Sequence, residues 1–183
     1  MRTADADILL VPGLGGSEPD HWQRRWAARL PTSRVLEQED FDRPRLDSWR
    51  TRLVAEIRRD GRPTILVAHS LGCLVVAHSA KALEGLPVAG AFLVAPPSAE
   101  TVATLPSVDR AFAATPTERL PFPALVVASR DDPYSSYADA ERLAGTLGAE
   151  LVDAGQSGHL NVESGHGPWP EGLMRFAGFL KTL

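Results

Sequence analysis

Ser70 stands where a run of apolar residues gives way to a helical pattern. The run Thr64–Ala68 leads directly into Ala68-His69-Ser70-Leu71-Gly72, so small residues lie two positions before and two positions after the serine. This order is typical of a nucleophile elbow, a tight turn that holds a serine in a strained conformation where backbone segments nearly touch. A serine before a helix can also serve only as an N-cap. The order of residue types favours the nucleophile, with Ala68 in place of the commoner glycine.

A serine hydroxyl is a weak nucleophile, so it needs a base that accepts its proton and a carboxylate that orients the base. Where an elbow carries such a serine, an Asp or Glu and then a His follow it along the chain, each after a later strand. The run Ala124–Ala128 is followed by Asp131 and Asp132, and the run Glu150–Val152 is followed by His159. Adjacent residues of an extended turn point in opposite directions, so only one aspartate can face the histidine. Position alone does not separate the two.

The same chemistry needs hydrogen-bond donors for the negative charge that develops on the attacked oxygen. The backbone N–H of Leu71 follows the serine at a helix N-terminus, where the helix dipole favours negative charge. The glycine-rich stretch Val11–Gly16 follows the first apolar run, and we expect the N–H of Leu14 to be the second donor. A phosphate-binding loop is a weaker interpretation, because the stretch lacks both the Lys-Ser/Thr pair and the full G-x-G-x-x-G spacing.

Short apolar runs alternate with longer helical patterns along the whole chain. The apolar runs predict strands at Ile8–Val11, Arg34–Leu36, Thr64–Ala68, Val88–Val94, Ala124–Ala128 and Glu150–Val152. Between and after them we expect helices near residues 20–29, 46–59, 71–84, 99–113, 137–147 and 170–182. Such alternation predicts an α/β fold with helices on both faces of a mainly parallel sheet and right-handed crossovers. We expect one domain over residues 1–183.

Local signals also predict how two of these helices begin and end. Asp47 or Ser48 can cap a helix that ends at Asp60-Gly61. Another helix begins near Ser136 and is followed by Gly148, a residue type that suits a helix C-terminus.

Composition excludes several classes of protein. The 183 residues include 19 Lys and Arg against 23 Asp and Glu, a formal net charge of −4, and the basic residues form no block. Nucleic-acid binding, which depends on clustered positive charge, is therefore not expected. The lone cysteine, Cys73, excludes an intramolecular disulfide and is expected to be a buried, inert thiol. Since no apolar stretch suits a signal peptide or a spanning helix, we expect a cytoplasmic protein that does not bind membranes.

These residues together resemble the small serine hydrolases of the α/β-hydrolase superfamily that are grouped with YdeN and retinoblastoma-binding protein nine. The resemblance covers nearly the whole chain and rests on Val11-Pro-Gly-Leu-Gly-Gly16, Asp20-His-Trp22, Ala68-His-Ser-Leu-Gly72, Asp131-Asp-Pro133, Gly158-His-Leu-Asn161, Glu163-Ser-Gly165 and Trp169-Pro-Glu-Gly172. It implies a minimal three-layer α/β/α fold of about six strands, without the first strands of larger relatives. It also implies a triad of Ser70, Asp132 and His159 that cleaves small carboxylic esters without a metal or an organic cofactor.

One relative in this group is named for binding a pocket protein through a Leu-x-Cys-x-Glu peptide. In this chain the cysteine lies in Leu71-Gly-Cys73-Leu-Val75, with valine where glutamate is required, so that partner is not expected. A minimal lipase and a hydrolase-fold binding protein with weak catalysis are the alternative functions. The stretch Ala95–Pro123 is either a plain connection with one helix or a lid over a pocket. Residues that could line such a pocket are His21, Trp22, Tyr134 and Trp169.

Overall fold

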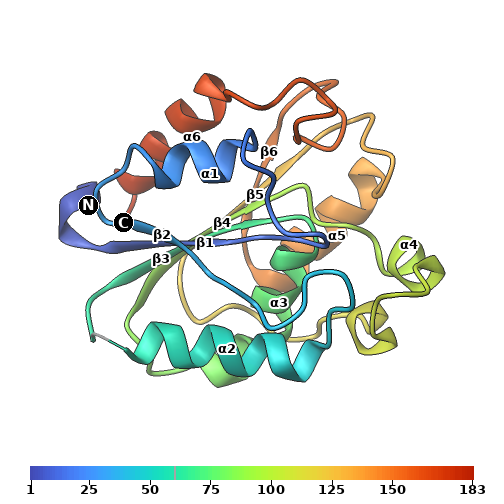
Figure 1. Ribbon diagram of the computed structural model, residues 1–183, viewed down its shortest axis with the longest axis horizontal. Coiled ribbons are helices and arrows are strands. Elements are labelled where there is room, and N and C mark those ends of the chain that lie inside the picture. Colours follow the sequence, from blue (N-terminus) through green and yellow to red (C-terminus); the bar gives the residue numbers. More distant parts are fainter. Residues whose placement is uncertain (60) are drawn as a thin grey trace.

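The computed structural model, which describes residues 1–59 and 61–183, contains one six-stranded parallel sheet (Figure 1). Its strand order is β2-β1-β3-β4-β5-β6, and each adjacent pair is parallel. The strands are β1 (Asp7–Val11), β2 (Ser33–Val35), β3 (Thr64–His69), β4 (Val88–Val94), β5 (Ala124–Ala128) and β6 (Glu150–Asp153). All six predicted strands are confirmed, and their bounds differ from the predicted ones by no more than one residue at either end.

Helices cover both faces of this sheet, so the predicted three-layer arrangement is confirmed (Figure 1). Alternate side chains of each strand enter opposite layers, as Ile8 and Leu9 of β1 do. The layer around Ile8 is covered by α1 (Trp22–Ala27) and α6 (Pro170–Leu180). The layer around Leu9 is covered by α2 (Leu46–Arg58), α3 (Leu71–His78) and α5 (Tyr137–Leu147). Because both faces are buried, the inner strands are apolar except at their ends, where Asp7, Thr64 and His69 lie.

Two predicted helices are interrupted. The expected helix over 99–113 is instead α4 (Ala99–Thr104) followed by a short 3-10 helix, η3 (Arg110–Ala113). Pro106 explains the break, because a proline pushes the residue before it out of the helical region, and Leu105 is extended. The expected helix over 71–84 is divided into α3 and the 3-10 helix η2 (Ala80–Leu83). A further 3-10 turn, η1 (Thr3–Asp5), precedes the first strand.

Of the two predictions about helix caps, the one for α5 is confirmed, whereas the capping residues predicted for α2 are wrong. Ser136 caps α5 by accepting a hydrogen bond from the Asp139 backbone, and Gly148 ends that helix with a left-handed φ of 68°. For α2, Arg45 occupies the N-cap position, and Asp47 and Ser48 lie within the first turn. The predicted end of α2 at Asp60 falls outside the described residues.

The sheet order determines where a site can form. From β1 the chain adds β2 on one side, and it then returns to add β3 on the other side of β1. The edge beyond the carboxyl ends of β1 and β3 is therefore a switch point, where ligands bind in open α/β sheets. The loop 12–16 and the turn at Ser70 both follow these two strands at that edge. Among the described residues, no helix is both long and apolar enough to span a membrane.

Candidate active site

Ser70 occupies the sharp turn between β3 and α3. Its φ of 53° and ψ of −126° are unfavourable for a residue with a side chain, as expected of a strained elbow. The turn also packs tightly against the strand beside it. A Cβ added at Gly72 would lie 2.4 Å from the carbonyl oxygen of Val11, so only glycine fits without a shift. The small residue that the sequence places two positions after the serine therefore has a direct steric cause.

Ser70, His159 and Asp132 form a continuous chain of hydrogen bonds. The Ser70 Oγ lies 2.9 Å from Nε2 of His159, and Nδ1 of the same imidazole lies 3.0 Å from each carboxylate oxygen of Asp132. The Asp132 side chain is 3 % exposed and the His159 side chain is 9 % exposed. With Nδ1–H donating to the carboxylate, Nε2 is free to accept the serine proton. Residues from the ends of β3, β5 and β6 thus meet at one edge of the sheet.

The neighbouring Asp131 points elsewhere and holds the loop that carries the histidine. Its Oδ1 accepts hydrogen bonds from the Ser129 hydroxyl at 2.7 Å and from the Gly158 backbone at 2.8 Å. The Ser129 hydroxyl in turn accepts one from the Ser157 backbone at 2.9 Å. The hydrogen bond from Ser129 has the largest effect and, with the backbone hydrogen bonds, lowers the pKa of Asp131. The two adjacent aspartates therefore face different partners, as the extended turn predicts.

The His159 loop is also fixed from the opposite side. The His159 carbonyl oxygen accepts a hydrogen bond from Nε2–H of His69 at 2.9 Å, and the Leu160 carbonyl accepts one from the indole N–H of Trp22 at 2.9 Å. Desolvation by burial, followed by repulsion from His21 and His159, lowers the pKa of His69 well below its ordinary value. A neutral His69 keeps its Nε2 proton for the carbonyl, so its role at this site is to hold the loop.

The glycine-rich loop after β1 lies directly beside the elbow. A Cβ added at Gly13 would lie 2.8 Å from the Ser70 Cβ and 3.2 Å from the Leu71 backbone nitrogen. Within residues 1–59 and 61–183, neither the Leu14 N–H nor the Leu71 N–H donates a hydrogen bond. Both are therefore available to an oxygen bound next to the serine.

These groups surround a cavity of about 240 Å³. Two of the side chains expected at a pocket, His21 and Tyr134, line it, and the Tyr134 ring packs edge-on against His159 with ring centroids 4.5 Å apart. The segment after β4 contributes one wall, a role that its sequence left undecided between a connection and a lid. Lining residues that the sequence did not indicate include Glu18, Pro97, Thr101, Leu105, Asn161 and Val162. Of these, only Asn161 lay within a motif, two residues after the histidine.

Trp22 and Trp169, which were also expected near a pocket, do not line this cavity. Both are buried in the layer between the sheet and the helices α1 and α6, where they pack against each other with ring centroids 5.1 Å apart. Their large apolar surfaces explain this placement, because burying a tryptophan is among the largest contributions to a core. Trp22 still touches the site indirectly, through its hydrogen bond to the Leu160 carbonyl.

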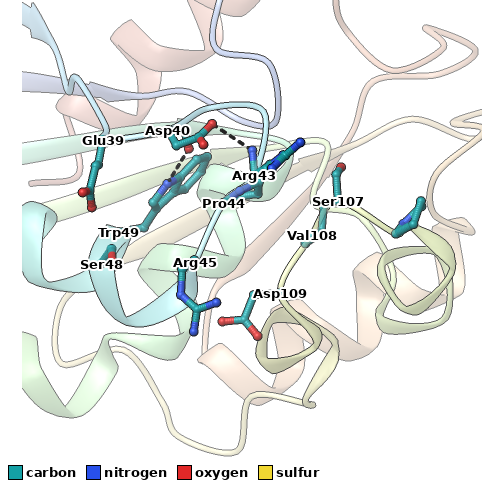
Figure 2. A pocket seen from close by; sticks show the side chains of 11 residues that line it. Glu39, Asp40, Arg43, Pro44, Arg45, Ser48, Trp49, Ser107, Val108 and Asp109 are labelled. Carbon is teal, nitrogen blue, oxygen red and sulfur yellow. Dashed lines mark hydrogen bonds between the residues drawn. The ribbon is translucent and has the colours of Figure 1, made fainter.

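A larger cavity of about 920 Å³ lies away from Ser70, between the segment 39–49 and the turn 106–109 (Figure 2). Two of its acidic residues, Asp40 and Asp109, hold the local backbone. Asp40 accepts hydrogen bonds from the backbone of Arg43 and, through its own carbonyl, from the Trp49 indole, as Figure 2 shows. Asp109 accepts one from the Leu46 backbone at the start of α2. None of its lining residues is a histidine, so this cavity lacks the imidazole of a serine triad.

Cys73 is not an alternative nucleophile. It lies in α3 and is fully buried, and its thiol donates to the Val94 carbonyl at 3.3 Å. Burial strongly raises the pKa of this thiol, so the reactive thiolate is not formed at neutral pH.

The chain is similar to several known proteins. The serine hydrolase family model matches residues 8–178. The chain is 24 % identical to the YdeN hydrolase of Bacillus subtilis over 166 residues, which is 86 % of this chain and 87 % of YdeN. A solved YdeN-like hydrolase of Pectobacterium atrosepticum is 32 % identical, with a TM-score of 0.85 over 98 % of this chain and 93 % of the other.

More distant structures share the fold. Esterase 2 of Thermogutta terrifontis is 13 % identical and superposes with a TM-score of 0.67 over 100 % of this chain and 85 % of its own. A likeness at that identity concerns the fold alone. The family match, by contrast, spans most of the chain, from β1 into α6. The chain therefore belongs to the serine hydrolase family and has the α/β-hydrolase fold, with YdeN-like hydrolases among its relatives.

Proposed function

We propose that the chain is an esterase-like serine hydrolase that cleaves small carboxylic esters with Ser70, His159 and Asp132. The observation that carries this proposal is the unbroken series of contacts from the Ser70 hydroxyl through the imidazole to a buried carboxylate. That series is the arrangement that activates a serine for attack on an acyl carbon.

In the proposed reaction, the Ser70 Oγ attacks the ester carbonyl carbon while Nε2 of His159 takes the hydroxyl proton. The oxygen of the tetrahedral intermediate accepts hydrogen bonds from the amides of Leu14 and Leu71. Asp132 holds the Nδ1–H tautomer and stabilises the imidazolium. Loss of either amide donor should cost about 2.7–4 kcal/mol of transition-state stabilisation.

The intermediate then collapses and the carbon–oxygen bond to the alcohol breaks. His159 gives its proton to the departing alcohol, which leaves an acyl group on the Ser70 Oγ. Water attacks this acyl-enzyme with His159 again as the base, and the acid is released. The protein groups and water supply every proton that moves, so the reaction requires no further reactant.

The size of the cavity favours small substrates over long-chain lipids. At about 240 Å³ it is smaller than the pockets of about 300–1,000 Å³ that hold drug-sized ligands. We therefore expect p-nitrophenyl acetate and butyrate to be cleaved with a much higher kcat/KM than p-nitrophenyl palmitate. A preference for the palmitate, rising at an oil–water surface, would favour the alternative of a minimal lipase.

A fluorophosphonate probe tests the nucleophile directly. Esterase 2 of Thermogutta terrifontis is known in a form phosphonylated by cyclosarin, which supports the choice of reagent. The wild-type chain should become labelled at Ser70, and Ser70→Ala should lose both labelling and ester turnover while its circular dichroism stays native. A native chain that is not labelled, or an alanine variant with undiminished turnover, would reject the proposal in favour of a hydrolase-fold binding protein.

A further inference from the structure

His21 lines the cavity, and only one of its two ring nitrogens has a hydrogen-bond partner among the described residues. The residue is 5 % exposed, and its Nδ1 accepts a hydrogen bond from the Gln23 backbone at 3.2 Å. Its Nε2 has no hydrogen-bond partner in the part of the chain that the structure describes. His21 lines the cavity, and its Nε2 is not among the described side-chain atoms that are fully buried without a partner, so this nitrogen keeps a little accessible surface and is available to a ligand.

The hydrogen bond at Nδ1 determines what the other nitrogen offers. Because Nδ1 accepts a proton from an amide, the proton of the neutral ring must lie on Nε2. Burial, with a smaller contribution from His159, lowers the pKa of His21 to about 4, so the ring is neutral at physiological pH. His21 therefore presents an uncharged N–H donor to the cavity.

The support beneath His21 keeps this donor in place. His21 caps α1, whose Gln23 side chain is fully buried. The Gln23 amide donates to the carbonyls of Val11 and Val67, at 3.2 and 3.0 Å, and accepts a hydrogen bond from Ser17 at 2.6 Å. The first turn of α1 is thus attached to the carboxyl ends of β1 and β3. A donor held this rigidly loses little entropy when it binds a partner.

The ring of His69 lies between His21 and the proposed base, His159. The His69 ring contacts both histidines, with centroids 4.8 Å from His21 and 4.9 Å from His159. His21 therefore addresses a part of the bound molecule other than the carbonyl beside Ser70. The exposed carboxylate of Glu18 lines the same cavity and disfavours a substrate that carries its own negative charge.

We propose that Nε2–H of His21 donates a hydrogen bond to a neutral oxygen of the substrate, so that the site selects short esters with a hydroxyl, ether or keto oxygen near the ester group. This proposal rests on the proposed esterase function and deepens it. The oxygen can belong to the acyl part or to the alcohol part of the ester. In both cases it accepts the same hydrogen bond from Nε2–H of His21.

Two variants separate this role from the capping of α1. His21→Asn keeps a side-chain acceptor at the position of Nδ1, because asparagine is a good N-cap, but its side chain ends short of Nε2. His21→Gln brings an amide N–H to the position of Nε2 and loses the cap. If His21 binds the substrate, His21→Asn is the variant with altered selectivity. If His21 only caps α1, His21→Gln is the variant with lowered stability and activity.

Matched ester pairs supply the readout. In the acyl pair, p-nitrophenyl methoxyacetate has an ether oxygen where p-nitrophenyl butyrate has a methylene group. In the alcohol pair, 2-methoxyethyl butyrate and butyl butyrate differ in the same way. The ratio of kcat/KM values within each pair is compared between the wild-type chain and each variant, which cancels the intrinsic reactivity of the esters.

In His21→Asn, we expect this ratio to fall about tenfold in one pair, which identifies the part of the substrate that carries the oxygen. His21→Gln should keep the wild-type ratio. Unchanged ratios in both pairs for His21→Asn, or an equal fall in His21→Gln, would overturn the proposal. Fluorophosphonate labelling of the wild-type chain tests the proposed nucleophile separately, so a labelled, active enzyme with unchanged ratios refutes the role of His21 alone.

Discussion

Both carboxylate oxygens of Asp132 lie 3.0 Å from Nδ1 of His159. The imidazole N–H is therefore covered by a carboxylate that is itself almost inaccessible to water. The next residue back along the chain, Asp131, binds the backbone of the histidine loop instead. One short turn thus supplies both a partner for the ring and a support for the loop that carries it.

This division of roles predicts very different effects for two similar substitutions. Asp132→Asn should lower kcat by about 10⁴-fold, because an amide can donate to Nδ1 and stabilise the wrong tautomer of the ring. Asp131→Asn keeps an acceptor oxygen for Ser129 and Gly158, so its loss should be far smaller. Steady-state kinetics with p-nitrophenyl butyrate compares the two variants. The opposite ranking would assign the acid to Asp131.

The buried histidines predict that acid destabilises the fold. Burial lowers the pKa of His21 to about 4 and that of His69 well below its ordinary value, whereas unfolded histidine titrates near 6.5. Below about pH 6.5 the unfolded chain therefore binds more protons than the folded one, and the free energy of unfolding decreases as the pH falls toward 4. Above about pH 6.5 both histidines are neutral in the folded and the unfolded chain, so this loss of stability is absent.

Urea unfolding between pH 7.5 and pH 4.5 measures this dependence. His21→Asn removes one of the groups responsible while keeping the cap of α1, so its free energy of unfolding should change less steeply with pH. Parallel curves for the variant and the wild-type chain would contradict this assignment.

Gly72 and Gly178 form a matched pair of helical glycines. A methyl group at Gly72 would meet the backbone oxygens of Val11 and Pro12, whereas one at Gly178 has no neighbour within 4 Å. Gly72→Ala should therefore destabilise the fold by about 3 kcal/mol, and Gly178→Ala should stabilise it by about 1 kcal/mol. Chemical denaturation of both variants tests this, and a stable Gly72→Ala would mean that the elbow can move away from β1.

The strained backbone of Ser70 predicts a conflict between stability and activity. Glycine adopts a φ of 53° without a Cβ clash, whereas alanine keeps the strain. Ser70→Gly should therefore be more stable than Ser70→Ala by about 1–3 kcal/mol, although both lack the proposed nucleophile. Thermal unfolding of the two inactive variants provides the comparison, and equal midpoints would show that the turn stores no strain.

The sequence predicts most of this fold because its local signals agree with its tertiary structure. Apolar β-branched runs mark the buried strands, and Ser136 and Gly148 delimit α5 through contacts within a few residues. The way in which α2 is capped was not predictable from such local signals. Its Leu46 N–H binds the Asp109 carboxylate, 63 residues away, so no local capping residue is needed there.

The residues of the candidate site likewise include some that local sequence signals predict and others that depend on tertiary packing. The turns after strands carry Ser70, Asp132 and His159, and the edge of a parallel sheet necessarily gathers such turns. The walls of the cavity come from loops whose paths depend on packing, so Thr101 and Val162 gave no signal in the sequence. The sequence also could not predict that Trp22 and Trp169 lie in the core, because a tryptophan suits both a core and a binding pocket.

The proposed base lies on a loop that is supported by side chains from much earlier in the chain, Trp22 and His69. Ribosomes make a chain from its N-terminus, so Ser70 is synthesised well before His159. Until the last strand and its loop have docked, the serine has no group to take its proton. Under the proposed mechanism a nascent chain therefore carries a dormant nucleophile, and its activity begins only when translation has passed the histidine and the last strand has joined the sheet.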